Sequence, residues 1–253
     1  MARHLSFRSG NPALNRNTFK GFSTERSSGP IFKDNVMTIE GTVNKTALSL
    51  LLLMFSGYYA YSSFMGSYIW LGFGLGIVAF LVTFFKKELA PITTPIYSLC
   101  QGLVLGGISY MYAQQFDGIV FNAVCLTAFI LLSLLFAYKS RIIKATDNLK
   151  LGIFAATGGI ALFYIIGIIG LFLGFEVPFL SPTDGSITSI LITLFIVIIA
   201  SLNLVLDFDF IEEGSENGAP KYMEWYAAFG LMVTLVWLYL EILRLLAKIN
   251  SRD

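Results

Sequence analysis

The sequence predicts an all-α membrane protein with seven transmembrane helices, and three observations support this. Of its 253 residues, 56% are hydrophobic and only 13% are charged, whereas soluble domains carry about 25% charged residues. The mean hydropathy is +0.73. Apolar stretches of about 20 residues, long enough to cross a bilayer at ~1.5 Å per residue, fill nearly all of the chain after Val43. They leave no room for a soluble enzyme domain.

The apolar stretches are separated by residues that favour turns, such as Asp117-Gly118 and the segment from Gly214 to Pro220. The predicted spans are 46–63, 66–85, 96–113, 119–138, 150–174, 187–208 and 223–246. We expect residues 44–250 to form one seven-helix membrane domain. Residues 1–43 are rich in Ser, Asn, Gly and Arg and contain no apolar core, which predicts a flexible tail.

The basic residues predict the orientation, because Lys and Arg in short loops are retained on the cytoplasmic side. Of the 17 Lys and Arg residues, all but Arg244, Lys248 and Arg252 fall in the tail or in the predicted inner parts of the chain. We therefore expect a cytoplasmic N terminus and an outer C terminus, with the lipid bilayer as the main partner. The formal net charge of +1 gives no reason to expect nucleic-acid binding.

Catalytic sites are not expected in the membrane domain. The only histidine is His4 in the tail, so neither a Ser-His pair nor a Cys/His metal cluster can be assembled within the spans. Asp207 and Asp209 are two residues apart on one segment and do not face each other as the acids of a two-aspartate protease would. We expect no enzymatic activity, no cofactor and no resident metal.

The first functional candidates are Asp207 and Asp209, at the inner end of the sixth apolar run. A carboxylate costs about 2.5 to 3.5 kcal/mol at mid-membrane, so it usually faces a partner or a water-filled cavity. Lys86 ends the second span at the same predicted depth, and an ion pair with Asp207 would open when the acid is protonated. Asn203 lies one turn before Asp207 and would extend the polar face. The alternative is that Lys86 and Asp207 merely end their helices among lipid headgroups.

Two further patterns concern local contacts. Glu241 precedes Arg244 by three residues and Lys248 by seven, which favours an ion pair along its own helix. Gly102 with Gly106 and Gly170 with Gly174 have the spacing of small residues at close helix contacts.

Three parts of the chain together resemble the Bax inhibitor-1 family, also called the transmembrane Bax-inhibitor-motif proteins. They are the seven spans, the segment LDFDFIEEG and the closing helix AAFGLMVTLVWLYLEILRLL. The phrases NPALNRNTF, MTIEGTVNKTA and GAPKYMEWYAAFG resemble a bacterial branch of that family. The likeness, over residues 42 to about 248, implies a bundle whose last helix is surrounded by the other six. It also implies location in a bacterial plasma membrane and a pH-sensitive calcium leak.

The resemblance also implies site residues. Asp207 matches a family aspartate of the sixth helix, and Lys86 matches a basic latch residue, whereas Thr234 stands where the seventh helix of the family carries a second aspartate. Without like-charge coupling, a pH response would be shifted or lost. Asp209, where many relatives have glutamine, is expected to attract cations. Two hypotheses follow: a calcium or other cation leak, or a non-conducting regulator that binds membrane proteins such as quality-control proteases.

Overall fold

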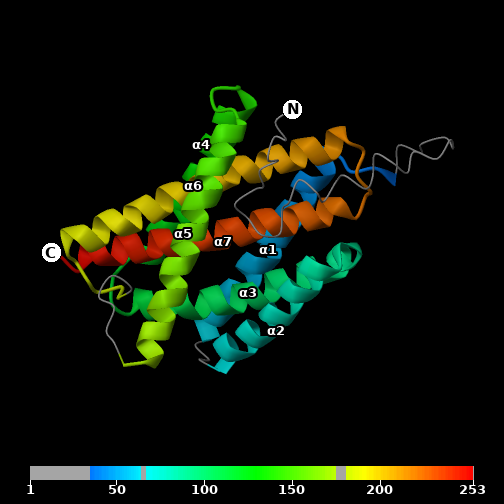
Figure 1. The fold of residues 1–253 in the computed structure, drawn as a ribbon. Helices are drawn as coiled ribbons and strands as arrows, with labels where there is room; N and C mark the ends of the chain where they lie inside the picture. The colour runs from blue at the N-terminus through cyan, green and yellow to red at the C-terminus, as the bar shows by residue number, and fades with distance from the viewer. Residues whose placement is uncertain (1–34, 64–66, 175–180, 253) are drawn as a thin grey trace. The chain divides into compact units, whose positions relative to one another are not determined.

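A computed structural model describes residues 35–63, 67–174 and 181–252 (Figure 1). These residues form seven α-helices and no β-strand, which confirms the predicted all-α fold. The elements are α1 (Ile39–Ser63), α2 (Ser67–Phe85), the short 3-10 helix η3 (Lys87–Leu89), α3 (Ala90–Ala113), α4 (Ile119–Lys139), α5 (Asp147–Phe172), α6 (Ile187–Glu216) and α7 (Met223–Asn250). Residues 1–34, most of the predicted tail, lie outside the described residues.

Five helices in the described part of the chain are long and apolar enough to cross a membrane: Lys87–Ala113, Ile119–Lys139, Asp147–Phe172, Ile187–Glu216 and Met223–Asn250. The described apolar part of α2, Ile69–Phe85, is shorter. The crossings predicted for the first two spans therefore stay predictions, while the multi-pass membrane character follows from the other five.

Three helix boundaries differ from the predicted ones by more than five residues. Helix α1 begins at Ile39, within the predicted tail, because the hydroxyl of Thr38 accepts a hydrogen bond from the backbone N–H of Gly41 at 3.0 Å and caps the helix. Helix α3 begins at Ala90, because Pro91 fits a first turn that needs no N–H donor. Helix α6 continues to Glu216, so Asp207 and Asp209 lie inside a helix and not at its end.

The described residues belong to two compact units. The α1–α3 unit contains residues 35–114 and 207–233, and the α4–α5 unit contains residues 115–206, apart from 175–180, and 234–252. Helices α6 and α7 contribute to both units.

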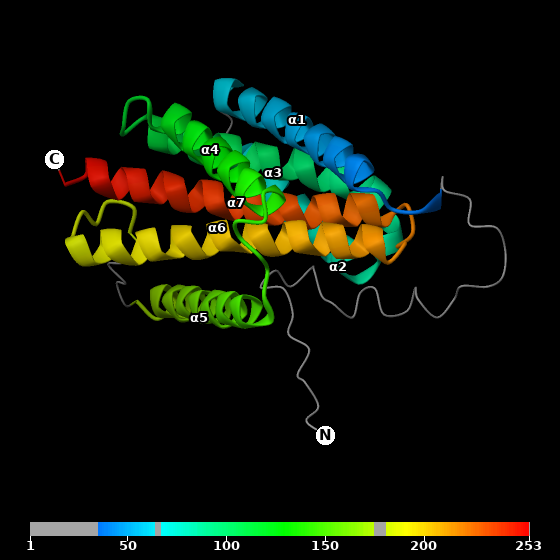
Figure 2. The same cartoon turned by 90° about the horizontal axis from the view of Figure 1, so that it is seen from above.

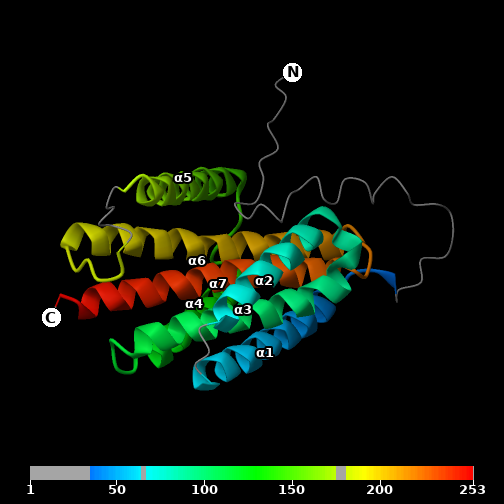
Figure 3. The ribbon, with the colours of Figure 1, turned by 90° about the horizontal axis from the view of Figure 1, so that it is seen from below.

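In the α1–α3 unit, α3 packs against both α1 and α2 (Figure 3). Small residues allow α1 and α3 to approach closely. A Cβ atom added to Gly102 would lie 1.9 Å from Ser56 Oγ and 2.3 Å from the carbonyl oxygen of Leu53, and one added to Gly106 would lie 2.2 Å from the carbonyl oxygen of Gly57. The close contact predicted for Gly102 and Gly106 is therefore confirmed.

In the α4–α5 unit, α5 lies next to α6 (Figure 2), where Ile160 packs with Ile196 and Ile199. The packing role predicted for Gly174 is wrong. This residue follows the end of α5 with a φ of +82°, and a Cβ atom there would meet no described atom within 4 Å. Gly174 is needed for the left-handed backbone that ends the helix.

Helix α7 is buried in each unit. Met223, Ala227 and Met232 are 0% exposed in its first part, and Leu243 and Ala247 are 0% exposed in its second part. This burial explains why the ionisable side chains on α7 need partners inside the protein; the implied central position of the last helix stays a prediction.

Candidate functional site

The five residues predicted to line an ion path differ widely in exposure. Asp207 is 0% exposed, Asn203 2% and Thr234 3%. Asp209 is partly exposed, and Lys86 is exposed. Burial of an acid, an amide and a hydroxyl inside apolar helices is costly without polar contacts, so the first three are not simple helix ends in a headgroup layer. Their roles in an ion path stay predictions.

The predicted ion pair between Lys86 and Asp207 is not formed in this structure. Lys86 directly follows α2, where its backbone N–H donates to the carbonyl of Val82 and its own carbonyl accepts from Leu89. Its side chain is exposed and has no ion-pair partner among the described residues. Lys86 thus lies at the exposed end of α2, whereas Asp207 lies on the buried face of α6.

Asn203 joins α6 to α5. Its Nδ2 atom donates to Thr157 Oγ1 and to the carbonyl oxygen of Ile199, both at 2.9 Å. Its Oδ1 atom is buried and has no hydrogen-bond partner within the described part of the chain. The amide is thus directed toward α5, which the sequence did not predict.

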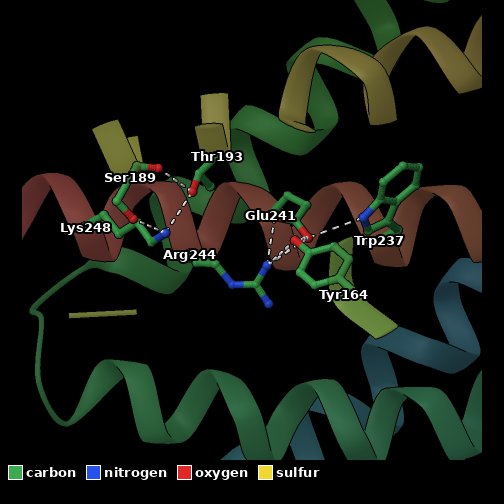
Figure 4. Close-up of polar contacts among 7 residues, drawn as sticks. All are labelled: Tyr164, Ser189, Thr193, Trp237, Glu241, Arg244 and Lys248. Atoms are coloured by element: carbon green, nitrogen blue, oxygen red, sulfur yellow. Dashed lines mark hydrogen bonds and ion pairs between the residues drawn. The ribbon is translucent and has the colours of Figure 1, made fainter. Parts of the chain in front are cut away.

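A second set of polar side chains surrounds Glu241 on α7 (Figure 4). Glu241 Oε1 accepts hydrogen bonds from the Tyr164 hydroxyl on α5 at 2.6 Å and from Trp237 Nε1 at 3.3 Å. Arg244 Nη1 donates to Oε1 at 3.0 Å and to Oε2 at 2.9 Å. The predicted ion pair with Arg244 is confirmed. Tyr164 was not predicted from the sequence, because its only signal was a phenol inside an apolar span.

Lys248 lies inside α7 and not at or beyond its end, because the helix continues to Asn250. It is 0% exposed. Its Nζ atom donates to Ser189 Oγ at 2.6 Å and Thr193 Oγ1 at 2.9 Å, both on α6 (Figure 4). Lys248 thus hydrogen-bonds across to α6, and Arg244 is the base that contacts Glu241.

A third buried carboxylate, Glu224, was not predicted from the sequence. It is 0% exposed. Its Oε1 atom accepts from the backbone N–H of Thr38 at 3.0 Å and from the Thr38 hydroxyl at 2.9 Å. Lys45 Nζ pairs with Oε2, and Lys221 Nζ lies 3.2 Å from Oε1. The carboxylate therefore accepts hydrogen bonds from the residue that precedes α1 and compensates the positive charges of two lysines.

Gly41 leaves room for this carboxylate in its observed position, because a Cβ atom there would lie 2.2 Å from Glu224 Oε1. Beside it, Val36 and Pro220 form an isolated antiparallel bridge, and the Met37 N–H donates to the Ala219 carbonyl at 2.7 Å. The segments MTIEGTVNKTA and GAPKYMEWYAAFG, far apart in the sequence, are thus in direct contact. We call residues 35–38, 219–221 and Glu224 the strap.

Comparison with known proteins decides the family. A family model described as Bax inhibitor 1 like matches residues 11–251. The chain belongs to the Bax inhibitor-1 family. Comparisons with curated proteins and with solved structures found no significant match. Family membership and the apolar helices together make this chain a multi-pass membrane protein of the Bax inhibitor type.

The described residues of this Bax inhibitor-1 protein include ionisable groups but no cluster of side chains that could chelate a metal ion. No group of three or more His, Cys, Asp and Glu side chains that could hold a metal ion occurs among them. Asp207, Glu224 and Glu241 are instead single carboxylates on α6 and α7, each at most 2% exposed. Single buried carboxylates can form ion pairs, exchange protons or bind a passing cation weakly.

Proposed function

We propose that this Bax inhibitor-1 protein provides a gated, low-flux route for cations, calcium among them, across a bacterial plasma membrane. The observation that carries the proposal is Asp207, a carboxylate that is 0% exposed within an apolar helix long enough to span the membrane. An ionised carboxylate at such a place attracts cations, and protonation removes that attraction. Flux through this route would therefore depend on pH.

The neighbouring residues refine the proposal. Asp209, two residues nearer the end of α6 and partly exposed, would raise the local cation concentration at the inner mouth. Thr234 supplies a hydroxyl where the resemblance implies a second aspartate, so no like charge from that position raises the pKa of a partner acid. We propose a cytoplasmic N terminus and an outer C terminus, as the Lys and Arg distribution predicts.

The experiment is calcium flux into liposomes that contain purified protein, at about pH 6 and about pH 8, a range in which only carboxylates with a strongly raised pKa change their charge. The parent should show a pH-dependent flux, and Asp207→Asn should lose that dependence. Glu216→Gln, at the exposed end of α6, is the matched control and should resemble the parent. Thr234→Asp should steepen the pH profile. If liposomes with the parent and liposomes with each variant are all impermeable to calcium, the conduction proposal is refuted.

The second candidate function is a non-conducting regulator that binds other membrane proteins, including quality-control proteases. Two points favour it: Thr234 stands where the resemblance implies a second carboxylate, and no ion pair joins Lys86 to Asp207 among the described residues. Site-directed photocrosslinking from the lipid-exposed faces of α4 and α5 would identify such partners. If the parent protein passes no calcium and crosslinks reproducibly to one partner, this function is established in place of transport.

A further inference from the structure

The guanidinium of Arg244 occupies a position that a free cation could take. Its Nη1 atom lies among three oxygens: Glu241 Oε2 at 2.9 Å, Glu241 Oε1 at 3.0 Å and the Tyr164 hydroxyl at 2.5 Å (Figure 4). Two of these oxygens come from α7 and one from α5. One positively charged nitrogen is thus held by a carboxylate and a phenol within apolar helices.

The exposures of the two partners differ. The Glu241 side chain is 3% exposed, whereas the Arg244 side chain is 25% exposed. Trp237 Nε1 also holds Glu241 Oε1 at 3.3 Å. The long flexible side chain of Arg244 can therefore move the guanidinium outward through its exposed side, while the carboxylate stays in place. The vacated position would keep both carboxylate oxygens and the Tyr164 hydroxyl.

The charges decide which cation fits. Glu241 carries one negative charge, and Arg244 and Lys248 carry one positive charge each. The Lys248 ammonium donates to Ser189 and Thr193 on α6. If Arg244 leaves, a monovalent cation restores the same total charge. A divalent cation would add an uncompensated charge in a low-dielectric site, which is costly.

We propose that Glu241 and Tyr164 form a binding site for a monovalent metal cation, which Arg244 occupies as a tethered competitor. The site is separate from the proposed path at Asp207, and its existence does not require that the protein conducts. One carboxylate and one phenol make a weak site. A cation can bind only while Arg244 is out of the site. The apparent affinity is therefore the intrinsic affinity multiplied by the fraction of time for which the site is open. Removing the guanidinium is expected to strengthen cation binding about tenfold or more.

Trp237 provides a direct readout, because its indole donates to the same Glu241 oxygen. Thallium(I) is a monovalent cation that quenches indole fluorescence. The titration uses the full-length protein in nanodiscs, with Trp70 and Trp225 replaced by Phe so that Trp237 alone is observed. Arg244→Gln should show saturable quenching that potassium reverses and that choline at the same ionic strength does not. The parent should need about tenfold or more thallium for the same quenching.

Two variants make the test decisive. The double variant with Glu241→Gln and Arg244→Gln has the same side-chain volumes as Arg244→Gln alone and should lose the saturable quenching. Arg244→Lys restores a tethered cation and should bind thallium as weakly as the parent. Equal quenching with and without Glu241 would overturn the site, and equally tight binding in Arg244→Lys and Arg244→Gln would overturn the competition. Circular dichroism confirms that each variant is folded, and calcium flux, measured separately, reports only on the Asp207 proposal.

Discussion

Replacing Glu224 by glutamine tests whether the strap stabilises the protein through one buried charge. The carboxylate is 0% exposed and contacts Thr38, Lys45 and Lys221. Glutamine keeps an oxygen that can accept from Thr38, so the cap of α1 is retained. What the substitution removes is the negative charge that compensates the two lysines.

The expected cost follows from the exposure of these lysines. The Lys221 side chain is 47% exposed, so its ion pair contributes about 0 to 1 kcal/mol. The Lys45 side chain is only 20% exposed. Breaking a fully buried pair costs about 3 to 5 kcal/mol, and partial access of Lys45 to water reduces this. We expect the free energy of unfolding to fall by about 2 to 3 kcal/mol, which corresponds to roughly 4 to 12 °C in Tm for a chain of this size.

The assay is thermal unfolding in detergent micelles, followed by circular dichroism and by tryptophan fluorescence. Glu216→Gln is the matched control, because it removes the same charge from an exposed position and should change stability by less than about 0.5 kcal/mol. If Glu224→Gln is as stable as this control, the charge on Glu224 does not stabilise the strap. The expectation that a buried charge contributes more than an exposed one is then refuted.

Two other predictions concern helix packing and orientation. Gly102→Ala would place a Cβ atom 2.3 Å from the carbonyl oxygen of Leu53, so we expect a loss of about 1 to 3 kcal/mol in unfolding free energy. Gly74→Ala, in open space on α2, should be neutral or stabilising by about 0.5 to 1 kcal/mol; equal losses in thermal unfolding would contradict the packing argument. For orientation, Lys144→Cys, with the native cysteines replaced by alanine, should react with an impermeant maleimide only after the cytoplasmic side is opened. Labelling of intact cells would reverse the predicted topology.

Some features could be predicted from the sequence because their physical causes are local. The length of the apolar runs predicts helices, since a chain in lipid must satisfy its backbone hydrogen bonds within each segment. The spacing of Glu241 and Arg244 predicts their ion pair, because residues three apart lie on one face of a helix. The approach of α1 at Gly102 and Gly106 follows from a recurrent packing motif.

The boundaries and the buried partners could not be predicted in the same way. Helix α6 extends past Asp207 to Glu216, because polar residues can continue a helix beyond its apolar part. The contact between Glu224 and Thr38 joins residues 186 positions apart, and the one between Tyr164 and Glu241 joins residues 77 positions apart. Neither pair is marked by a periodic spacing of residues in the sequence.

Hydrophobicity and spacing alone therefore determined the class of the protein, the number of helices and the pairing within one helix. The tertiary structure alone decided which charges meet: it left Lys86 exposed, brought Lys248 to Ser189 and Thr193, and enclosed Glu224 at the start of α1. The physical reason is that a helix specifies which residues share its own face, whereas the rotation and packing of its neighbours determine what that face touches.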